Sequence, residues 1–337
     1  MNILALSLQF FACAAVIGAA GFVLSRSADR LAGMLGWGRG WVGLALLATV
    51  TSLPELAAGI SAVVVVDAPN LAVGNALGAC VANLAFLVII DAVQRHQPIY
   101  RAAGPTQLLS AGFSVVMLGF VALSLVVGRN NPALLHVGLY SPLLLGFYLL
   151  ALRSVHAHER DLLRALTSSG AAPEPVDQQM LRREWRRFGL AAVAVVGAGI
   201  WLPEAADQLA QALGLSRSFV GTIFLALATT LPEMAVTLSA LRIGALDMAI
   251  GNLLGSNLFN VLILAIDDLF YVRGPLLADA SAAHGGTAVA AMLMSGLVII
   301  GLVMRPQGRV LRVTSWISIG LVAAYAINLA VIYLAAA

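Results

Sequence analysis

Long apolar segments separated by short polar gaps dominate the chain. Each segment is about 20 residues long or more, which is enough for a helix to cross a hydrocarbon layer about 30 Å thick. We therefore predict an all-α integral membrane protein with ten transmembrane helices. They are expected at residues 3–24, 34–66, 70–91, 106–128, 133–152, 188–212, 217–243, 246–270, 282–304 and 314–335.

The composition agrees with this pattern. The chain is 61% hydrophobic and 10% charged, and its mean hydropathy of +0.95 lies outside the range of soluble domains. No basic residue precedes the first apolar segment, so we expect a retained helix there and not a signal peptide. Cys13 and Cys80 both fall in predicted helices and predict neither a disulfide framework nor a metal site.

All 19 basic residues are arginines, and their placement predicts an orientation. With ten helices, one set of alternate loops holds only Arg129, Arg217 and Arg273. The positive-inside rule makes the other set cytoplasmic and puts both termini outside. This distribution predicts the lipid bilayer as a partner and excludes nucleic acid, and it leaves the oligomeric state open. The cytoplasmic set is Arg26, Arg30, Arg39, Arg95, Arg101, Arg153, Arg160, Arg164, Arg182, Arg183, Arg186, Arg187, Arg242, Arg305, Arg309 and Arg312.

One longer polar segment, residues 153–187, divides the chain into two halves of five helices each. We expect residues 1–152 to form the first five-helix repeat and residues 188–337 the second. Between them we expect a cytoplasmic linker, with an interfacial helix around "MLRREWRRF".

The two halves repeat the same sequence. "VGLALLATVTSLPELAAGISA" at residues 42–62 aligns without a gap with "VGTIFLALATTLPEMAVTLSA" at residues 220–240. Further along, "VGNALGACVANL" aligns with "IGNLLGSNLFNV". Because each half has an odd number of helices, the halves should cross the membrane in opposite directions. Such inverted repeats are typical of secondary transporters, which bind substrate near the membrane midplane.

The repeated motif places a proline and a carboxylate inside an apolar helix. Pro54 and Pro232 cannot donate a backbone hydrogen bond, so the second helix of each half should break there. Glu55 and Glu233 then lie in the first turn after the break, where the helix dipole favours a negative charge. Hydroxyls three and four residues before each glutamate should face the same side as its carboxylate. These hydroxyls belong to Thr51, Ser52, Thr229 and Thr230.

Two carboxylates that face each other in a membrane repel unless a cation lies between them. Carboxylates, hydroxyls, amides and backbone carbonyls are ligands for Ca²⁺ or Na⁺, whereas Zn²⁺ and Cu⁺ favour His and Cys. Asn83 and Asn260 follow the two "GNxxG" sequences and should bring amides to the break. The other repeated pair of acids, Asp91 and Asp268, lies at helix ends, where we expect capping or snorkelling.

The paired sequences "TSLPEL…GNALGACVAN" and "TTLPEM…GNLLGSNLFN" resemble the two alpha repeats of the calcium/cation antiporter superfamily, in its sodium/calcium exchanger branch. The resemblance implies that Glu55 and Glu233 are the central cation ligands. It also implies that the first and sixth helices are sliding gate helices. The remaining ligands that it implies are Thr51, Ser52, Thr229, Thr230, Asn83, Asn260, Ser256 and the carbonyls of Ala48 and Ala226.

The chain also departs from that family's pattern. The sequence "GTS" usual before "LPE" is replaced by "VTS" and "ATT", and the usual "GSN" becomes Gly78-Ala79-Cys80 in the first repeat. Ala79 has no hydroxyl, whereas Ser256 keeps one at the equivalent position. One half therefore lacks a ligand for a monovalent ion, and the usual sodium stoichiometry is not expected.

These observations predict a secondary active antiporter that exchanges Ca²⁺, or another divalent cation, for Na⁺ at a midplane site between Glu55 and Glu233. An H⁺-coupled divalent-cation exchanger and a cation channel are the alternatives left open. We find no paired nucleophile and base, histidine cluster or phosphate loop, so we expect no enzyme activity and no cofactor besides the transported ions.

Overall fold

The computed structural model describes residues 3–34, 47–94, 98–104, 106–166, 178–242, 244, 246–306, 308–310 and 314–336. Within this part of the chain the protein is almost entirely helical. Seven helices are long and apolar enough to cross a membrane, or eight if a pair bent by 43° counts as one. The seven are α1 (Ile3–Met34), α5 (Pro69–Val93), α7 (Thr106–Val127), α9 (Gln178–Leu213), α13 (Leu246–Phe270), α15 (Ala283–Met304) and α16 (Trp316–Ala336). Helix α8 (Tyr140–Leu166) is also long but is not one of them.

The second helix of each half is interrupted, as the prolines predict. In the first half α3 (Ala48–Thr51) is followed by α4 (Leu53–Val64). In the second half a series of short helices over Arg217–Thr229 leads into α12 (Leu231–Arg242), and these two segments are the pair bent by 43°. The short helices in this series are α10 (Arg217–Val220), the π-helical turn η3 (Gly221–Leu225) and α11 (Ala226–Thr229). Three further short helices lie elsewhere in the described part of the chain: α6 (Ile99–Ala102), η2 (Gly128–Asn130) and α14 (Leu276–Asp279).

The fifth helix begins later than the hydrophobic pattern predicts. Residues at the start of the apolar run 133–152 form an antiparallel hairpin of β1 (Ala133–Leu134) and β2 (Val137–Gly138), and α8 begins only at Tyr140. Leu135 in the turn has a positive φ of 59°, which a continuing helix does not allow. Hydropathy alone does not distinguish an apolar hairpin from a helix.

The predicted linker is helical at both ends. Helix α8 continues to Leu166, and the sequence "MLRREWRRF" forms the first turns of α9 instead of a separate interfacial helix. Residues 167–177 lie outside the described part of the chain.

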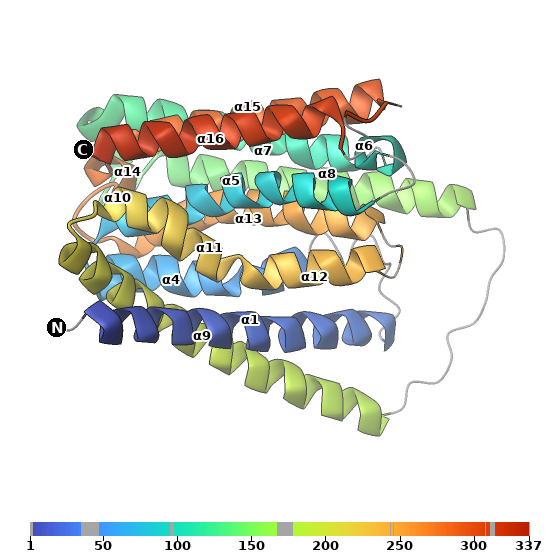
Figure 1. Cartoon of the computed structure of the whole chain (residues 1–337), viewed down its shortest axis with the longest axis horizontal. Coiled ribbons are helices and arrows are strands. Elements are labelled where there is room, and N and C mark those ends of the chain that lie inside the picture. The colour runs from blue at the N-terminus through green and yellow to red at the C-terminus, as the bar shows by residue number, and fades with distance from the viewer. Residues whose placement is uncertain are drawn as a thin grey trace.

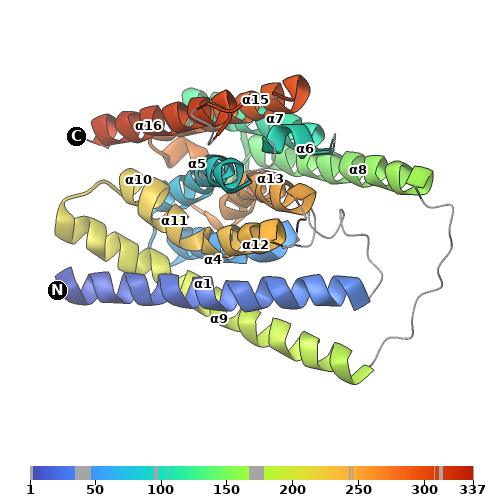
Figure 2. The ribbon, with the colours of Figure 1, turned by 45° about the vertical axis from the view of Figure 1, so that its right-hand side comes forward.

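Helices α5 and α13 form the centre of the bundle (Figure 1). Of the most apolar window of α13, 94% is buried, against 22% for α1. Figures 1 and 2 show α1 and α9 side by side on one flank, and α15 with α16 on the opposite flank. The N-terminal end of α1 and the C-terminal end of α16 lie at the same end of the molecule (Figure 1). This placement agrees with an even number of membrane crossings.

Two buried aspartates tie the halves to each other. Asp268, near the end of α13, accepts hydrogen bonds from Gly138 N and Tyr140 Oη of the first half at 2.9 and 2.6 Å. It also accepts one from Leu276 N at 2.7 Å, at the start of α14. One carboxylate therefore fixes the first turns of both α8 and α14, which explains where α8 begins.

Asp91 makes the equivalent bonds in the opposite direction. It lies near the end of α5 and accepts from Ile99 N of its own half at 3.1 Å. From the second half it accepts hydrogen bonds from Ser315 N at 2.7 Å and from Ser318 Oγ at 2.8 Å, at the start of α16. Each half thus caps the fifth helix of the other, so the capping expected for Asp91 and Asp268 is present in the structure.

The two flanking helices α1 and α9 contact the breaks through glycines at equivalent positions. A Cβ on Gly21 of α1 would lie 2.3 Å from the ring of Pro232, and one on Gly199 of α9 would lie 2.9 Å from Ala57 and 3.2 Å from the carbonyl of Pro54. Each of these helices therefore lies against the broken helix of the other half. Only a residue without a side chain allows so close an approach.

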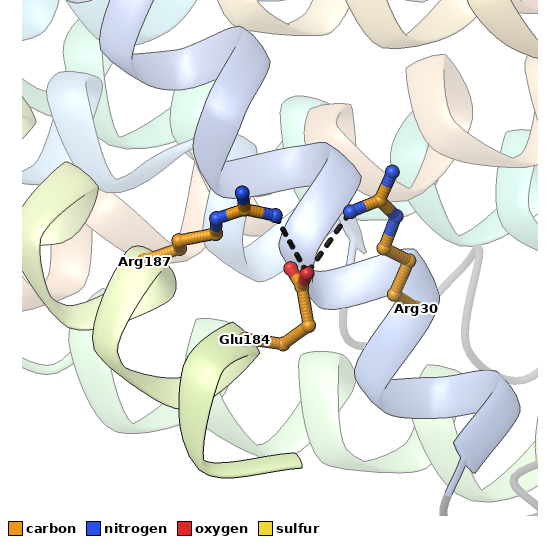
Figure 3. Close-up of polar contacts among 3 residues, drawn as sticks. All are labelled: Arg30, Glu184 and Arg187. Carbon is orange, nitrogen blue, oxygen red and sulfur yellow. Dashed lines mark hydrogen bonds and ion pairs between the residues drawn. The ribbon is translucent and has the colours of Figure 1, made fainter. Parts of the chain in front are cut away.

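An ion pair also joins the two flanking helices. Glu184 of α9 is buried, and its Oε1 accepts hydrogen bonds from Arg30 of α1 at 2.9 Å and from Arg187 at 2.8 Å (Figure 3). Both partners are arginines from the set predicted to be cytoplasmic. The contact ties α1 to α9 at one end of the pair.

The capping role of Asp268 predicts a large loss of stability when its charge is removed. We expect Asp268→Asn to lower the free energy of unfolding by about 3 kcal/mol, because several buried donors lose a charged acceptor. Thermal unfolding of the purified protein in detergent measures this change. Glu204→Gln is the matched control, since Glu204 is bonded only to Gln208 of its own helix among the described residues. Equal melting temperatures for the two variants would contradict the capping role.

Candidate cation-binding site

The two helix breaks have the same local geometry. Ser52 separates α3 from α4 with φ −87° and ψ 11°, and Thr230 separates α11 from α12 with φ −78° and ψ 2°. Each proline is the second residue of the following helix, where no backbone donor is needed. The sequence therefore sets both breaks, and each break puts a glutamate in the first turn that follows.

Glu55 and Glu233 are both completely buried. Oε1 of Glu233 accepts a hydrogen bond from Ser52 Oγ at 2.9 Å. Ser52 precedes Glu55 by three residues, so the hydroxyl expected to serve the glutamate of its own half instead contacts the glutamate of the other half. This crossed contact brings the two motifs to one place.

The threonine hydroxyls of both motifs donate to carbonyls one turn earlier. Thr51 Oγ1 lies 3.2 Å from the carbonyl of Ala48, and Thr229 Oγ1 lies 3.1 Å from that of Ala226. Thr230 Oγ1 also donates to Ala226, at 2.9 Å. Each hydroxyl has a single proton and two lone pairs, so an oxygen whose proton is taken by one of these acceptors can still offer a lone pair to a cation. For Thr229 the Ala226 carbonyl and Asn75 Oδ1 are alternative acceptors, both at 3.1 Å.

Ser256, the serine expected from the second repeat, lies beside Thr51 of the first repeat. Ser256 Oγ is buried and lies 3.5 Å from Thr51 Oγ1. At the equivalent position of the first repeat, Ala79 is also fully buried and offers no oxygen. The site is therefore chemically asymmetric although its backbone is repeated.

The asparagines that follow the "GNxxG" sequences have amide oxygens without a hydrogen-bond partner among the described residues. Asn83 Nδ2 donates to Asn257 Oδ1 at 3.1 Å, which leaves the Asn83 oxygen without a protein partner. Neither amide atom of Asn260 has a partner among the described residues, and both side chains are fully buried. The expected positions of Asn83 and Asn260 thus supply unpaired amide oxygens.

Sequence reasoning missed the asparagines within "GNxxG". Asn75 Nδ2 donates to the backbone carbonyl of Glu55 at 3.2 Å, and Asn252 Nδ2 donates to that of Glu233 at 3.4 Å. Thr229 of the second half in turn donates to Asn75 Oδ1 at 3.1 Å. The repeated Gly-Asn pair was the signal that could have identified these positioning residues.

Several buried oxygens of these candidate ligands have no protein donor in the described part of the chain. They are both carboxylate oxygens of Glu55, Oε2 of Glu233 and the amide oxygens of Asn83 and Asn260. A buried, unpaired carboxylate lowers the stability of the fold by roughly several kcal/mol unless a cation or a proton neutralises it. The donor set is all oxygen, which fits hard cations such as Ca²⁺ or Na⁺ as transported substrates.

Other singled-out residues lie elsewhere. Asp207 forms an ion pair with Arg217 at 2.5 Å and a hydrogen bond with Gln211 at 2.7 Å, so it stabilises the end of α9. Cys80 is buried and lies 3.7 Å from the carbonyl of Asn257.

A cavity of about 610 Å³ lies between α1, α12 and the start of α13. Its lining includes Arg26, Arg30 and Arg242, which belong to the set predicted to be cytoplasmic, and Val236, three residues after Glu233. The cavity therefore approaches the site from the arginine-rich end of the molecule.

The sequence is similar to those of known membrane transport proteins. The chain is 29% identical over 280 residues to the "Putative antiporter CaxA" of Alkalimonas amylolytica, covering 81% of this chain and 82% of that protein. It is 42% identical over 81 residues to the "Sodium/calcium exchanger MaX1" of Methanosarcina acetivorans, which is 24% of this chain and 23% of that protein. Both relatives carry names of ion exchangers or antiporters.

A solved structure of the sodium-calcium exchanger NCX_Mj has the same fold. The two structures superpose with a TM-score of 0.64 at 21% identity, covering 98% of this chain and 99% of the other. The family described as "Sodium/calcium exchanger protein" matches residues 6–153 and 185–334, which are both halves of the repeat. With most of its length matched, the chain belongs to the sodium/calcium exchanger protein family.

Proposed function

We propose that the chain exchanges Ca²⁺, or another divalent cation, for Na⁺ by alternating access at a site between Glu55 and Glu233. The observation that carries this proposal is the pair of fully buried glutamates, brought together by the Ser52–Glu233 contact, of whose four carboxylate oxygens three have no protein donor among the described residues. A divalent cation takes six to eight oxygen ligands, roughly, and the two motifs with their asparagines offer carboxylate, hydroxyl and amide oxygens in one place.

The two halves act as inverted five-helix repeats in this proposal. The equivalent breaks and the reciprocal caps of Asp91 and Asp268 support it. Ten crossings then put the arginine-rich loops and the cavity beside α12 on the cytoplasmic side, where the cavity gives ions access from the cytoplasm.

Helices α1 and α9 are the moving gate. They lie on one flank, contact Pro232 and Pro54 through Gly21 and Gly199, and are joined by Glu184 (Figures 2 and 3). Movement of this pair along the rest of the bundle would uncover the glutamates from one side at a time. A charged site crosses its barrier only when loaded, which couples the two ion fluxes.

A second candidate, H⁺ in place of Na⁺ as the counter-ion, is favoured by Ala79. The first half offers a methyl group where the second half offers the Ser256 hydroxyl. One monovalent-ion ligand is therefore missing, and protonation of a glutamate could replace it.

The central site predicts that both glutamates are essential. Glu55→Gln or Glu233→Gln should abolish uptake of radiolabelled Ca²⁺ into proteoliposomes with an outward Na⁺ gradient, because each removes a charge that the cation needs. Glu204→Gln, in the last third of α9, should keep wild-type uptake. The proposal is wrong if both site variants retain near-normal exchange, and a channel is indicated if Ca²⁺ flux needs no counter-ion.

The arginine distribution predicts the orientation. A cysteine introduced at Thr167 should react with an impermeant thiol reagent only from the cytoplasmic side, and one at Ala337 only from the outside. Cys13 and Cys80 are replaced by alanine in both proteins to remove background. The opposite accessibility would reverse the orientation and the direction of export.

The asymmetry at Ala79 predicts a gain of sodium response in Ala79→Ser. The added hydroxyl should raise Na⁺ affinity by about 2- to 13-fold, corresponding to about 0.5–1.5 kcal/mol for one hydrogen-bond-scale contact. The Na⁺ dependence of Ca²⁺ flux measures this change, and Ser256→Ala should weaken it. If neither variant alters the Na⁺ response and wild-type flux follows a pH gradient, H⁺ is the counter-ion.

A further inference from the structure

Asp267 is a buried carboxylate that the central site does not use. It lies in α13, is 0% exposed, and neither of its oxygens accepts a hydrogen bond from the described residues. Its neighbour Asp268 shows the contrast, because four donors from three segments satisfy that carboxylate. An unpaired acid in such surroundings needs a ligand that neutralises it.

The position of Asp267 connects it to the central site. A Cβ on Gly59 of α4 would lie 2.4 Å from Asp267 Oδ2, so the carboxylate lies directly against Gly59. Gly59 follows Glu55 by one turn on the same face of α4, about 6 Å along the axis. On α13, Asp267 follows Asn260 by two turns on the same face. Asp267 therefore lies in the α4–α13 interface, beyond the site and toward the end that holds the two chain termini (Figure 1).

The surroundings of Asp267 select the ligand. A metal ion needs several oxygen ligands, about six to eight for Ca²⁺, whereas Asp267 lies against Gly59, which has no side chain, and has no hydrogen-bond partner among the described residues. A proton needs only the carboxylate itself. Among candidate cations, the proton is the one that this place can hold.

The charged groups around α13 reinforce this choice. Asp268 is adjacent, Glu55 lies one turn away on α4, and α7 has no acidic or basic residue. A negative charge on Asp267 would therefore face other acids. Other titratable groups near α13 have partners of their own. Tyr140 bonds Asp268, Cys80 lies against the carbonyl of Asn257, and Asp279 bonds Tyr271. Glu233 bonds Ser52, Asp91 bonds Ser315 at the other end of the bundle, and Tyr148 packs on Phe259. Asp247, at the start of α13 and far along the helix from Asp267, accepts a hydrogen bond from Gly104 N, and Arg101, Arg242 and the charged second half of α8 lie on elements that pack against α13.

We infer that Asp267 is an exchangeable proton-binding site of this antiporter, one turn beyond the Glu55 carboxylate. The carboxyl group holds its proton while it is buried, as in this structure, and releases it when movement of the gate helix α9, which packs against α4, lets water reach it. The group changes only between carboxylic acid and carboxylate, so no other reactant is needed. Proton release at this point would make cation exchange pH-dependent whether Na⁺ or H⁺ is the main counter-ion.

The transport test compares Asp267→Asn with wild type, because Asn has nearly the same shape as the protonated acid. The full-length protein is reconstituted with a trapped pH-sensitive dye, and Ca²⁺ flux is measured over a range of pH. We expect Asp267→Asn to keep Ca²⁺ flux and to lose the pH dependence that the wild type shows. Asp67→Asn is the matched control, since Asp67 lies at the same end of the molecule in a surface ion pair with Arg273. An unchanged pH response in Asp267→Asn overturns the inference.

A second measurement does not depend on transport, whereas the first rests on the proposed antiport. Infrared difference spectra recorded against pH should contain a C=O stretching band of a protonated carboxyl group that is missing in Asp267→Asn. Its presence with no Ca²⁺ flux in the wild type would refute the antiport and leave the proton site standing. Its absence in the wild type would refute the proton site, whatever the flux.

A further variant keeps the inference testable if Asp267→Asn does not fold. Gly59→Ala places a methyl group against Asp267 Oδ2 and must displace the carboxyl group. The C=O band should then shift in frequency, and a band that stays in place would assign it to another residue and overturn the inference.

Discussion

The cost of burying carboxylates in a membrane governs this structure. Glu55 and Glu233 lie at the centre of the bundle without exposure to solvent, and most of their oxygens have no protein donor. A fold can keep two such groups together only if a cation or a proton shares the site with them. The broken helices supply hydroxyls and positive helix ends, which lower that cost without removing the need for an ion. In the proposed exchange, this need for an ion is what couples the two fluxes.

Exchange of contacts between the halves holds the site together. Ser52 of the first half bonds Glu233 of the second, and Thr229 of the second bonds Asn75 of the first. At the two ends of the bundle, Asp91 and Asp268 cap the fifth helices of the opposite halves. Neither half can complete its own contacts, so the paired structure folds as one unit around the ion site. The flanking helices α1 and α9 take no part in these hydrogen bonds and touch the two breaks through Gly21 and Gly199. The proposed gate movement of this pair would therefore leave the hydrogen bonds intact.

The sequence was sufficient for the parts of this design that are local or repeated. The prolines of both motifs predicted the breaks, because the reason for them lies within one turn of helix. The repeat also singled out asparagines and hydroxyls as candidate ligands, although not the positioning residues Asn75 and Asn252. It did not predict that Ser52 serves the opposite glutamate, or that α8 begins at Tyr140, because both depend on residues more than a hundred positions away. The ligand roles of these residues remain proposals.

Departures from the repeat distinguish the two halves chemically. Ser256 has a hydroxyl where Ala79 has none, and Asp267 has a carboxyl group where the first repeat has Ile90. A perfectly symmetric pair would offer an ion the same ligands from both halves. Each departure changes the side chains of one half only, so in the proposed exchange it can alter which monovalent ion binds without disturbing the two glutamates proposed to hold the divalent one. Asp267 could not be recognised from the repeat because it has no partner there, and only its burial and its contact with Gly59 single it out. If the proposed site is correct, the repeated residues form its common part, and the unrepeated polar residues are the positions at which this chain can set its own ion coupling.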